Sequence, residues 1–172
     1  MNVLTSFLKN QTADNYSWTN KLIENIAFDK WFITPEILET NLAWQIGHIT
    51  LSQYYYTIVL LTGPKKDVAE SINIKEYSGL FANGQNRKAL AAEITVQELL
   101  DHWKHLQAIT HEALTSLQDT DLSSNIFSMP KPHPFVKTKE DAISWNIKHT
   151  MWHCGQIAMW KRVIDKPFDF GM

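Results

Sequence analysis

The sequence predicts an all-α protein, a four-helix bundle with a long crossover between the second and third helices. Four long segments carry apolar residues at helical spacing. None of the pieces between them shows the alternation of apolar and polar residues that is typical of a strand. The connection over residues 63–93 is unusually long for two neighbouring helices. We expect residues 1–172 to form one domain, because a chain of this length buries enough surface for a single core.

The first helix is expected over residues 2–27. Apolar residues recur on one face of it at Leu4, Leu8, Leu22 and Ile26. Polar residues occupy the middle of the same stripe, namely Gln11, Asn15 and Thr19. Polar side chains on a core-facing stripe need partners. We therefore expect this stretch to help line an internal cavity.

The second helix is expected to begin near Thr34 and to run to about Thr62. Thr34 is a suitable N-cap, and Pro35 suits the first helical position. Gly63 and Pro64 then predict the end of the helix. In the crossover that follows, we expect one short helical turn and a segment, residues 76–84, that folds over one mouth of the bundle.

The third and fourth helices both begin with capping-box patterns. Thr95 precedes Glu98 by three residues and predicts a helix to about Leu117, whereas Thr138 precedes Asp141 by three and predicts a helix to about Asp165. The expected core stripe of the third helix is Val96, Leu99, Trp103, Leu106, Ala113 and Leu117. Residues 128–138 contain three prolines and are not expected to be helical throughout.

Composition restricts the function classes. The formal net charge is -2 and the chain has only two arginines, which argues against a nucleic-acid partner. The apolar run at residues 46–61 is interrupted by polar residues, so no membrane span is expected. The N-terminus lacks the pattern of a signal peptide. One cysteine, Cys154, suits a reducing compartment, and we expect the protein to be cytoplasmic.

Seven histidines suggest a metal site, but four of them are set aside first. Because the core stripe of the third helix faces the bundle axis, His105 and His111 are expected to face solvent, and His102 lies at the edge of the stripe. His133 lies in the proline-rich segment, where a surface position is expected. Three histidines remain.

His149 and His153 are four residues apart, which makes them neighbours on one face of the fourth helix. This face also carries Trp145 and Gln156, so we expect the pair to point inward. His48 lies in the apolar run of the second helix and is the natural third ligand. Facing helices of a bundle can place three imidazoles around one ion. The alternative is three separate core histidines, each with its own hydrogen-bond partner.

The paired motifs resemble a known family. The second helix reads W-x-x-G-H at residues 44–48, and the fourth reads H-x-x-x-H-x-G-Q-I at residues 149–157. Both are similar to the DinB/YfiT-like metal-binding four-helix bundles, in particular the DinB-like branch. The resemblance extends to NYSW at residues 15–18 and YSGLF at residues 77–81. It implies a divalent metal, zinc or nickel, held by His48, His149 and His153, and it implies a homodimer.

The resemblance also implies an activity, because characterised branches of this family include transferases and isomerases that use low-molecular-weight thiols. We expect a metal-dependent enzyme that acts on a small molecule, by thiol transfer or by hydrolysis. Gln156 and Asn15 are candidate ligand-binding residues of the pocket, and Gly155 suggests that a neighbouring helix approaches closely. No catalytic residue can be named, because no Asp or Glu adjoins the histidine motifs. The alternative is a non-catalytic bundle that binds a metal or a ligand.

Overall fold

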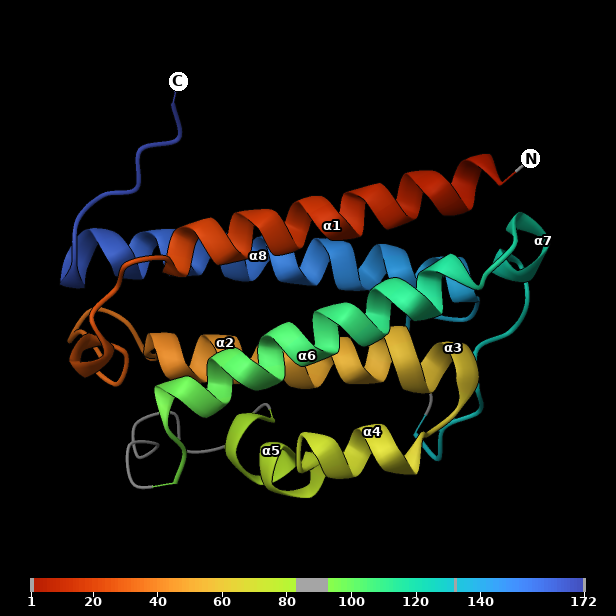
Figure 1. Ribbon diagram of the computed structural model, residues 1–172, viewed down its shortest axis with the longest axis horizontal. Helices are drawn as coiled ribbons and strands as arrows, with labels where there is room; N and C mark the ends of the chain where they lie inside the picture. Colours follow the sequence, from red (N-terminus) through yellow and green to blue (C-terminus); the bar gives the residue numbers. More distant parts are fainter. Residues whose placement is uncertain (1, 83–92, 132, 172) are drawn as a thin grey trace.

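The computed structural model describes residues 2–82, 93–131 and 133–171, and it confirms the predicted fold class. Three helices of the bundle are α1 (Val3–Ile23), α6 (Val96–Thr115) and α8 (Lys139–Ile164). The other is made of α2 (Leu42–Gln53), the π-helical turn η2 (Tyr54–Val59) and α3 (Leu60–Thr62), which follow one another without a break. In Figure 1, α1 lies beside α8 and α6 beside α2. Within the described ranges there is no strand, only an isolated antiparallel bridge between Asn125 and Thr138.

Both predicted capping boxes are present. The Thr95 side chain accepts a hydrogen bond from the backbone N–H of Glu98, and the carboxylate of Glu98 accepts one from the N–H of Thr95. Thr138 and Asp141 make the same exchange at the start of α8. These local signals fix where two of the four bundle helices begin.

The predicted start of the second helix is wrong. Residues near Thr34 are not helical, and α2 begins at Leu42 with Asn41 as its N-cap, whose side chain accepts from the N–H of Trp44. Before it, the chain forms the short 3-10 helix η1 (Phe28–Lys30) and a turn that buries Trp31. The Asn41 amide also reaches back to the hydroxyl of Thr34, so Thr34 supports the cap without being the cap.

The crossover holds more helix than one turn. It contains α4 (Lys66–Ser71) and α5 (Ile74–Phe81), and α5 packs against α2. Figure 1 shows both running along the outside of the second bundle helix. Residues 76–82 of the segment expected over the mouth of the bundle therefore lie against α2, whereas residues 83 and 84 lie outside the described residues. Gly63, with φ of 83°, ends α3 as predicted.

The predicted core stripe of α6 is buried in full. The first helix, expected to reach residue 27, ends at Ile23. Of its predicted stripe, Leu8 and Leu22 are buried on α1 and Ile26 is buried beyond its end, but Leu4 is exposed and the adjacent Thr5 is bound to Asp119 of the short helix α7 (Asp119–Leu122). In the part of the chain that the structure describes, no helix is long and apolar enough to cross a membrane.

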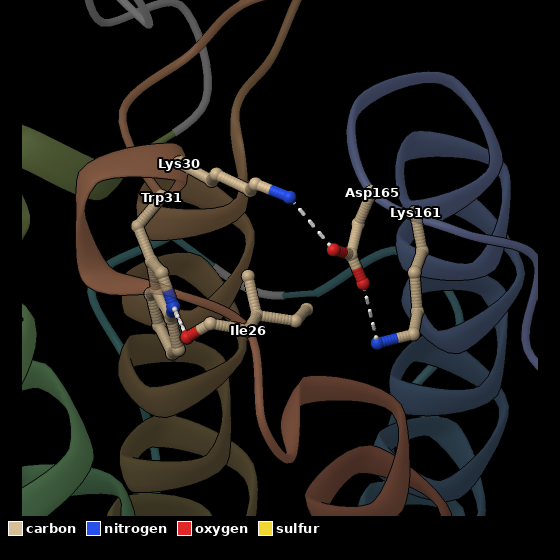
Figure 2. Close-up of polar contacts among 5 residues, drawn as sticks. All are labelled: Ile26, Lys30, Trp31, Lys161 and Asp165. Atoms are coloured by element: carbon tan, nitrogen blue, oxygen red, sulfur yellow. Dashed lines mark hydrogen bonds and ion pairs between the residues drawn. The ribbon is translucent and has the colours of Figure 1, made fainter.

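A polar clamp joins the end of α8 to η1. The Asp165 carboxylate pairs with Lys30 at 2.9 Å through one oxygen and with Lys161 at 3.3 Å through the other (Figure 2). The side chain of Lys161 is only 5% exposed, so the Asp165 carboxylate, and not bulk water, compensates its ammonium group. Nearby, the indole N–H of Trp31 donates to the carbonyl of Ile26. The clamp holds one end of the helix that carries two of the candidate ligands.

Candidate metal centre

The fold brings His48, His149 and His153 together between α2 and α8. The Nε2 atom of His149 lies 3.3 Å from that of His48 and 3.3 Å from that of His153. One potential ligand atom of each of the three imidazoles lies within 4.8 Å of the others. His48 and His153 are buried and His149 is half-buried. The three side chains predicted from the sequence therefore form one cluster in the interior of the bundle.

The outer nitrogens of two of these rings are fixed by acceptors. His48 Nδ1 donates to the backbone carbonyl of Phe81 at 2.7 Å, and a carbonyl can only accept. His153 Nδ1 donates to the side-chain oxygen of Gln45. The orientation of the Gln45 amide is itself set, because its nitrogen donates to Thr40 Oγ1 at 2.7 Å and to Gln156 Oε1 at 2.8 Å. Neutral His48 and His153 consequently carry their lone pairs on Nε2, toward the centre of the cluster.

This arrangement fits a divalent ion. The Nε2 lone pairs of His48 and His153 both face the Nε2 atom of His149. His149 Nδ1 is buried and has no hydrogen-bond partner among the described residues. A tetrahedral ion about 2.0 to 2.1 Å from each imidazole nitrogen sets its ligand atoms about 3.3 to 3.4 Å apart, which matches both spacings to His149.

Burial also favours the neutral, ligand-competent imidazoles. Burial, together with a smaller effect of the neighbouring imidazoles, lowers the pKa of His149 to about 4 and that of His153 to about 3. At neutral pH these rings therefore hold no second proton. The indole of Trp44 stacks on His48, with ring centroids 4.6 Å apart, and closes one side of the cluster with an apolar face.

Gly47 is the point of close approach in this site. A Cβ at this position would overlap the ring of Phe81, a fully buried side chain. The missing side chain lets α5 lie close enough to α2 for the Phe81 carbonyl to reach His48. The expectation that Gly155 has this role is wrong within one chain, because Gly155 is exposed and a Cβ there would meet nothing within 4 Å.

The other predicted pocket residues lie around the cluster. Gln156 is exposed, but its Oε1 accepts from Gln45, so it is two hydrogen bonds away from His153. Asn15 is buried and donates to the carbonyl of Ile147, which joins α1 to α8. Cys154 is buried against Thr19, and burial raises the pKa of its thiol. Whether Gln156 or Asn15 contacts a ligand stays a prediction.

The histidines set aside from the sequence do not join the cluster. His105 and His111 are exposed and His102 is half-buried, as expected. His133 is also half-buried, but its ring packs on Tyr56 and on Trp145, one turn before His149. The sequence therefore predicted a surface position for His133 but did not predict its contacts with residues beside the cluster.

A cavity of about 770 Å³ lies between the second bundle helix and residues of the segments 125–131 and 133–137. Ser52 and Tyr56, one and two turns beyond His48, line it, and the ring of Tyr56 lies 6.4 Å from that of His149. Tyr56 belongs to the π-helical turn η2, a feature that is frequent at functional sites because it changes the direction of the side chains that follow. Sequence reasoning missed this wall and also missed Gln45 and Phe81. Gln45 left a signal as a polar residue in an apolar run, and Phe81 is the last residue of the YSGLF segment.

Comparison with known proteins agrees with this geometry. The model of the DinB superfamily matches residues 11–157, most of the chain, including all three histidines. The chain belongs to the DinB superfamily. A solved structure of a conserved protein from Enterococcus faecalis resembles this DinB-superfamily chain with a TM-score of 0.72, 16% identity, and coverage of 95% of this chain and 98% of the other. At that identity the likeness shows the fold alone. No relative is found among curated proteins.

Proposed function

We propose that this DinB-superfamily protein is a metal-dependent enzyme that acts on a small molecule, by thiol transfer or by hydrolysis. The observation that carries the proposal is the convergence of three Nε2 atoms, two of them with their lone pairs set inward by Phe81 and Gln45. Zinc is the ion that the spacing favours, and nickel is the alternative. A low-molecular-weight thiol is the proposed co-substrate if the reaction is a transfer.

The donor set suits nucleophile activation. Three neutral imidazoles cancel none of the charge of a divalent ion, which when bound favours the deprotonated form of a water or thiol beside it. The protein residues do the remaining work. Gln45 and the Phe81 carbonyl orient two of the rings, and Trp44 excludes water from one face. Burial raises the pKa of Tyr56, whose ring lies near that of His149, so its hydroxyl stays protonated and can donate to a substrate.

A second candidate is a non-catalytic bundle in which the ion stabilises the fold. One observation favours it: neither the histidine cluster nor the lining of the adjacent cavity, within the described residues, includes a carboxylate that would act as a general base. Both candidates need the metal, and only one needs turnover. Two experiments therefore separate them.

The first experiment is metal analysis of the protein purified without an affinity tag. We expect about one equivalent of zinc or nickel in the wild type and a large loss in His48→Ala and in His149→Ala. His105→Ala, which removes an exposed histidine outside the cluster, is the matched control and should keep the metal. Wild-type protein that stays metal-poor after incubation with zinc and with nickel would contradict the proposed site.

The second experiment measures turnover on metal-loaded protein. Cysteamine with 1-chloro-2,4-dinitrobenzene reports thiol transfer, and 4-nitrophenyl acetate reports hydrolysis. An enzyme should lose either activity on chelation and in His149→Ala and regain it when metal is returned to the wild type. Turnover that survives removal of the metal would contradict the mechanism, whereas bound metal with no turnover on a wider substrate panel would favour the binding protein.

We also propose that the protein is a homodimer and that α8 supplies the interface. The outward face of α8 carries Trp152 and Met159, exposed by 55% and 52%, beside Gly155, and Ile37 next to it is 74% exposed. Apolar side chains gathered on one face are typical of an interaction surface. Sedimentation velocity should show a dimer that Trp152→Glu dissociates, while Val3→Glu, at an exposed apolar residue of α1, leaves it intact. A monomeric wild type would contradict the proposal.

A further inference from the structure

The cavity beside the histidine cluster combines an apolar body with positive charge. Its apolar lining consists of Leu51, Leu60, Ile126, Phe127, Met129 and Val136. Lys131 and Lys137 line the same cavity, and no Asp or Glu is among the described residues that do so. We propose that this cavity binds a small apolar carboxylate, an aliphatic or aromatic acid whose hydrocarbon part fills it and whose carboxylate meets the two lysines. As the substrate class of the site, this inference rests on the proposed function.

The size of the cavity and an exposed aromatic ring in its wall suit an apolar ligand. A volume of about 770 Å³ lies within the range of cavities that bury a small organic ligand. Phe127 is 46% exposed although it lines the cavity and packs against Gly63. An aromatic ring that is left half in water at a cavity wall gains from an apolar ligand that covers it.

Two lysines in the lining of the cavity favour an anionic ligand. Lys131 and Lys137 are both exposed and both line the cavity, so both attract an anion that approaches it. Asp141 is near Lys137, but its carboxylate accepts from the backbone N–H groups of Lys137 and Thr138 in the cap of α8. A neutral ligand gains nothing from the lysines, and a cation is repelled by them.

Two polar residues of the cavity wall, His133 and Tyr56, connect the cavity to the cluster. The Nδ1 of His133 accepts from the backbone N–H groups of Phe135 and Val136, so its remaining proton is on Nε2 and can be donated. Burial lowers the pKa of His133, which keeps the ring neutral. Tyr56 contacts the rings of both His133 and His149 and connects the cavity to the cluster. An acid held at the lysines therefore extends its far end toward the histidines.

The test compares three probes with the same hydrocarbon part by isothermal titration calorimetry: 4-phenylbutyrate, 4-phenylbutanol and 4-phenylbutylamine. We expect the acid to bind most tightly and the amine most weakly. The double variant Lys131→Gln/Lys137→Gln should weaken binding of the acid about five- to tenfold and leave the alcohol unchanged. The matched control, Lys75→Gln/Lys166→Gln, removes the same charge from exposed lysines that do not line the cavity and should keep the preference.

A further variant tests whether the three probes bind in the cavity. Ser128→Trp puts a large ring on the exposed part of the lining and should weaken all three probes without a change of charge. Equal affinity for acid and alcohol would overturn the inference, as would a preference that the double variant retains or that the control loses equally. Metal analysis of the same samples keeps the two proposals apart. Metal without an acid preference refutes only the substrate class, and an acid preference in protein that takes up no metal refutes only the metal enzyme.

Discussion

Replacing Gly47 by alanine tests whether the crossover positions the histidine cluster. Gly47 lies in the interior of α2, where alanine is about 1 kcal/mol more favourable than glycine from helix propensity alone. The new methyl group would overlap three carbons of the Phe81 ring. Phe81 is fully buried against Tyr77, with ring centroids 4.9 Å apart, so it cannot turn aside without moving α5. Overpacking of this kind costs about 1 to 3 kcal/mol.

Gly79→Ala is the matched control, because Gly79 is inside α5 and a Cβ there meets nothing within 4 Å. The control should gain up to about 1 kcal/mol. The propensity gain is common to both variants, so the difference in free energy of unfolding between them isolates the overlap with Phe81. We expect Gly47→Ala to be less stable than Gly79→Ala by about 1 to 3 kcal/mol.

The second effect is on metal binding. When Phe81 moves, the carbonyl that accepts from His48 Nδ1 moves with it. Loss of such an outer partner typically lowers metal affinity about 10- to 100-fold. Urea unfolding and competition with a chromogenic chelator measure the two quantities. If Gly47→Ala is as stable as Gly79→Ala and binds zinc equally well, the close contact of Phe81 with α2 is refuted.

Three further predictions concern single side chains. Gln45→Leu removes the acceptor of His153 Nδ1 and should lower zinc affinity about 10- to 100-fold in the chelator assay, and wild-type affinity would contradict that role. Asp165→Asn should destabilise the protein by about 1 to 3 kcal/mol at pH 7, because Lys161 is left buried, whereas Glu70→Gln in the exposed pair with Lys66 should cost under about 0.5 kcal/mol. The hydrogen bond from Lys30, ahead of the contact with Lys161, lowers the pKa of Asp165 below its ordinary value of 3.8. The stabilisation that the Asp165 carboxylate provides is therefore present above pH 3.8 and is lost as the pH falls through the lowered pKa. The free energies of unfolding of wild type and Asp165→Asn, measured by urea titration, should therefore converge in acid. A difference in stability that persists there would refute this origin. Thr138→Ala should cost about 1 kcal/mol through loss of the α8 cap, and an unchanged unfolding midpoint would argue against it.

The parts of the fold that rest on local chemistry were predictable. The capping boxes of α6 and α8 are formed by residues three apart, so the sequence alone contains them. The start of α2 was not predictable, because Thr34 and Asn41 are both good caps and the choice between them depends on tertiary packing, such as the burial of Trp31 in the turn that precedes both. The π-helical turn η2 was not predictable either. No spacing marks an extra residue in a helical turn, and tertiary packing decides where it occurs.

The same division applies to the site. His149 and His153 share a helix face by spacing, and His48 followed as the remaining histidine in an apolar run. The acceptor of His48 was invisible because it is a backbone carbonyl, which any residue at position 81 would supply. The cavity wall at residues 125–137 was also invisible, since it depends on how a non-helical segment returns to the second bundle helix. The position of His133 depends on this return.

The histidines of the cluster and the residues of the cavity wall serve two different functions. The histidines lie in the interiors of α2 and α8, far from fraying ends, and α8 is fixed at one end by its capping box and at the other by the Asp165 clamp. Such helices hold ligand atoms to within the few tenths of an ångström that a metal requires. The wall that would contact a substrate is a loop, and loops tolerate changes of sequence that helices do not. It follows that substitutions at residues 125–137 should change which molecule binds while leaving metal affinity intact, and that substitutions at Gln45 or Gly47 should do the reverse.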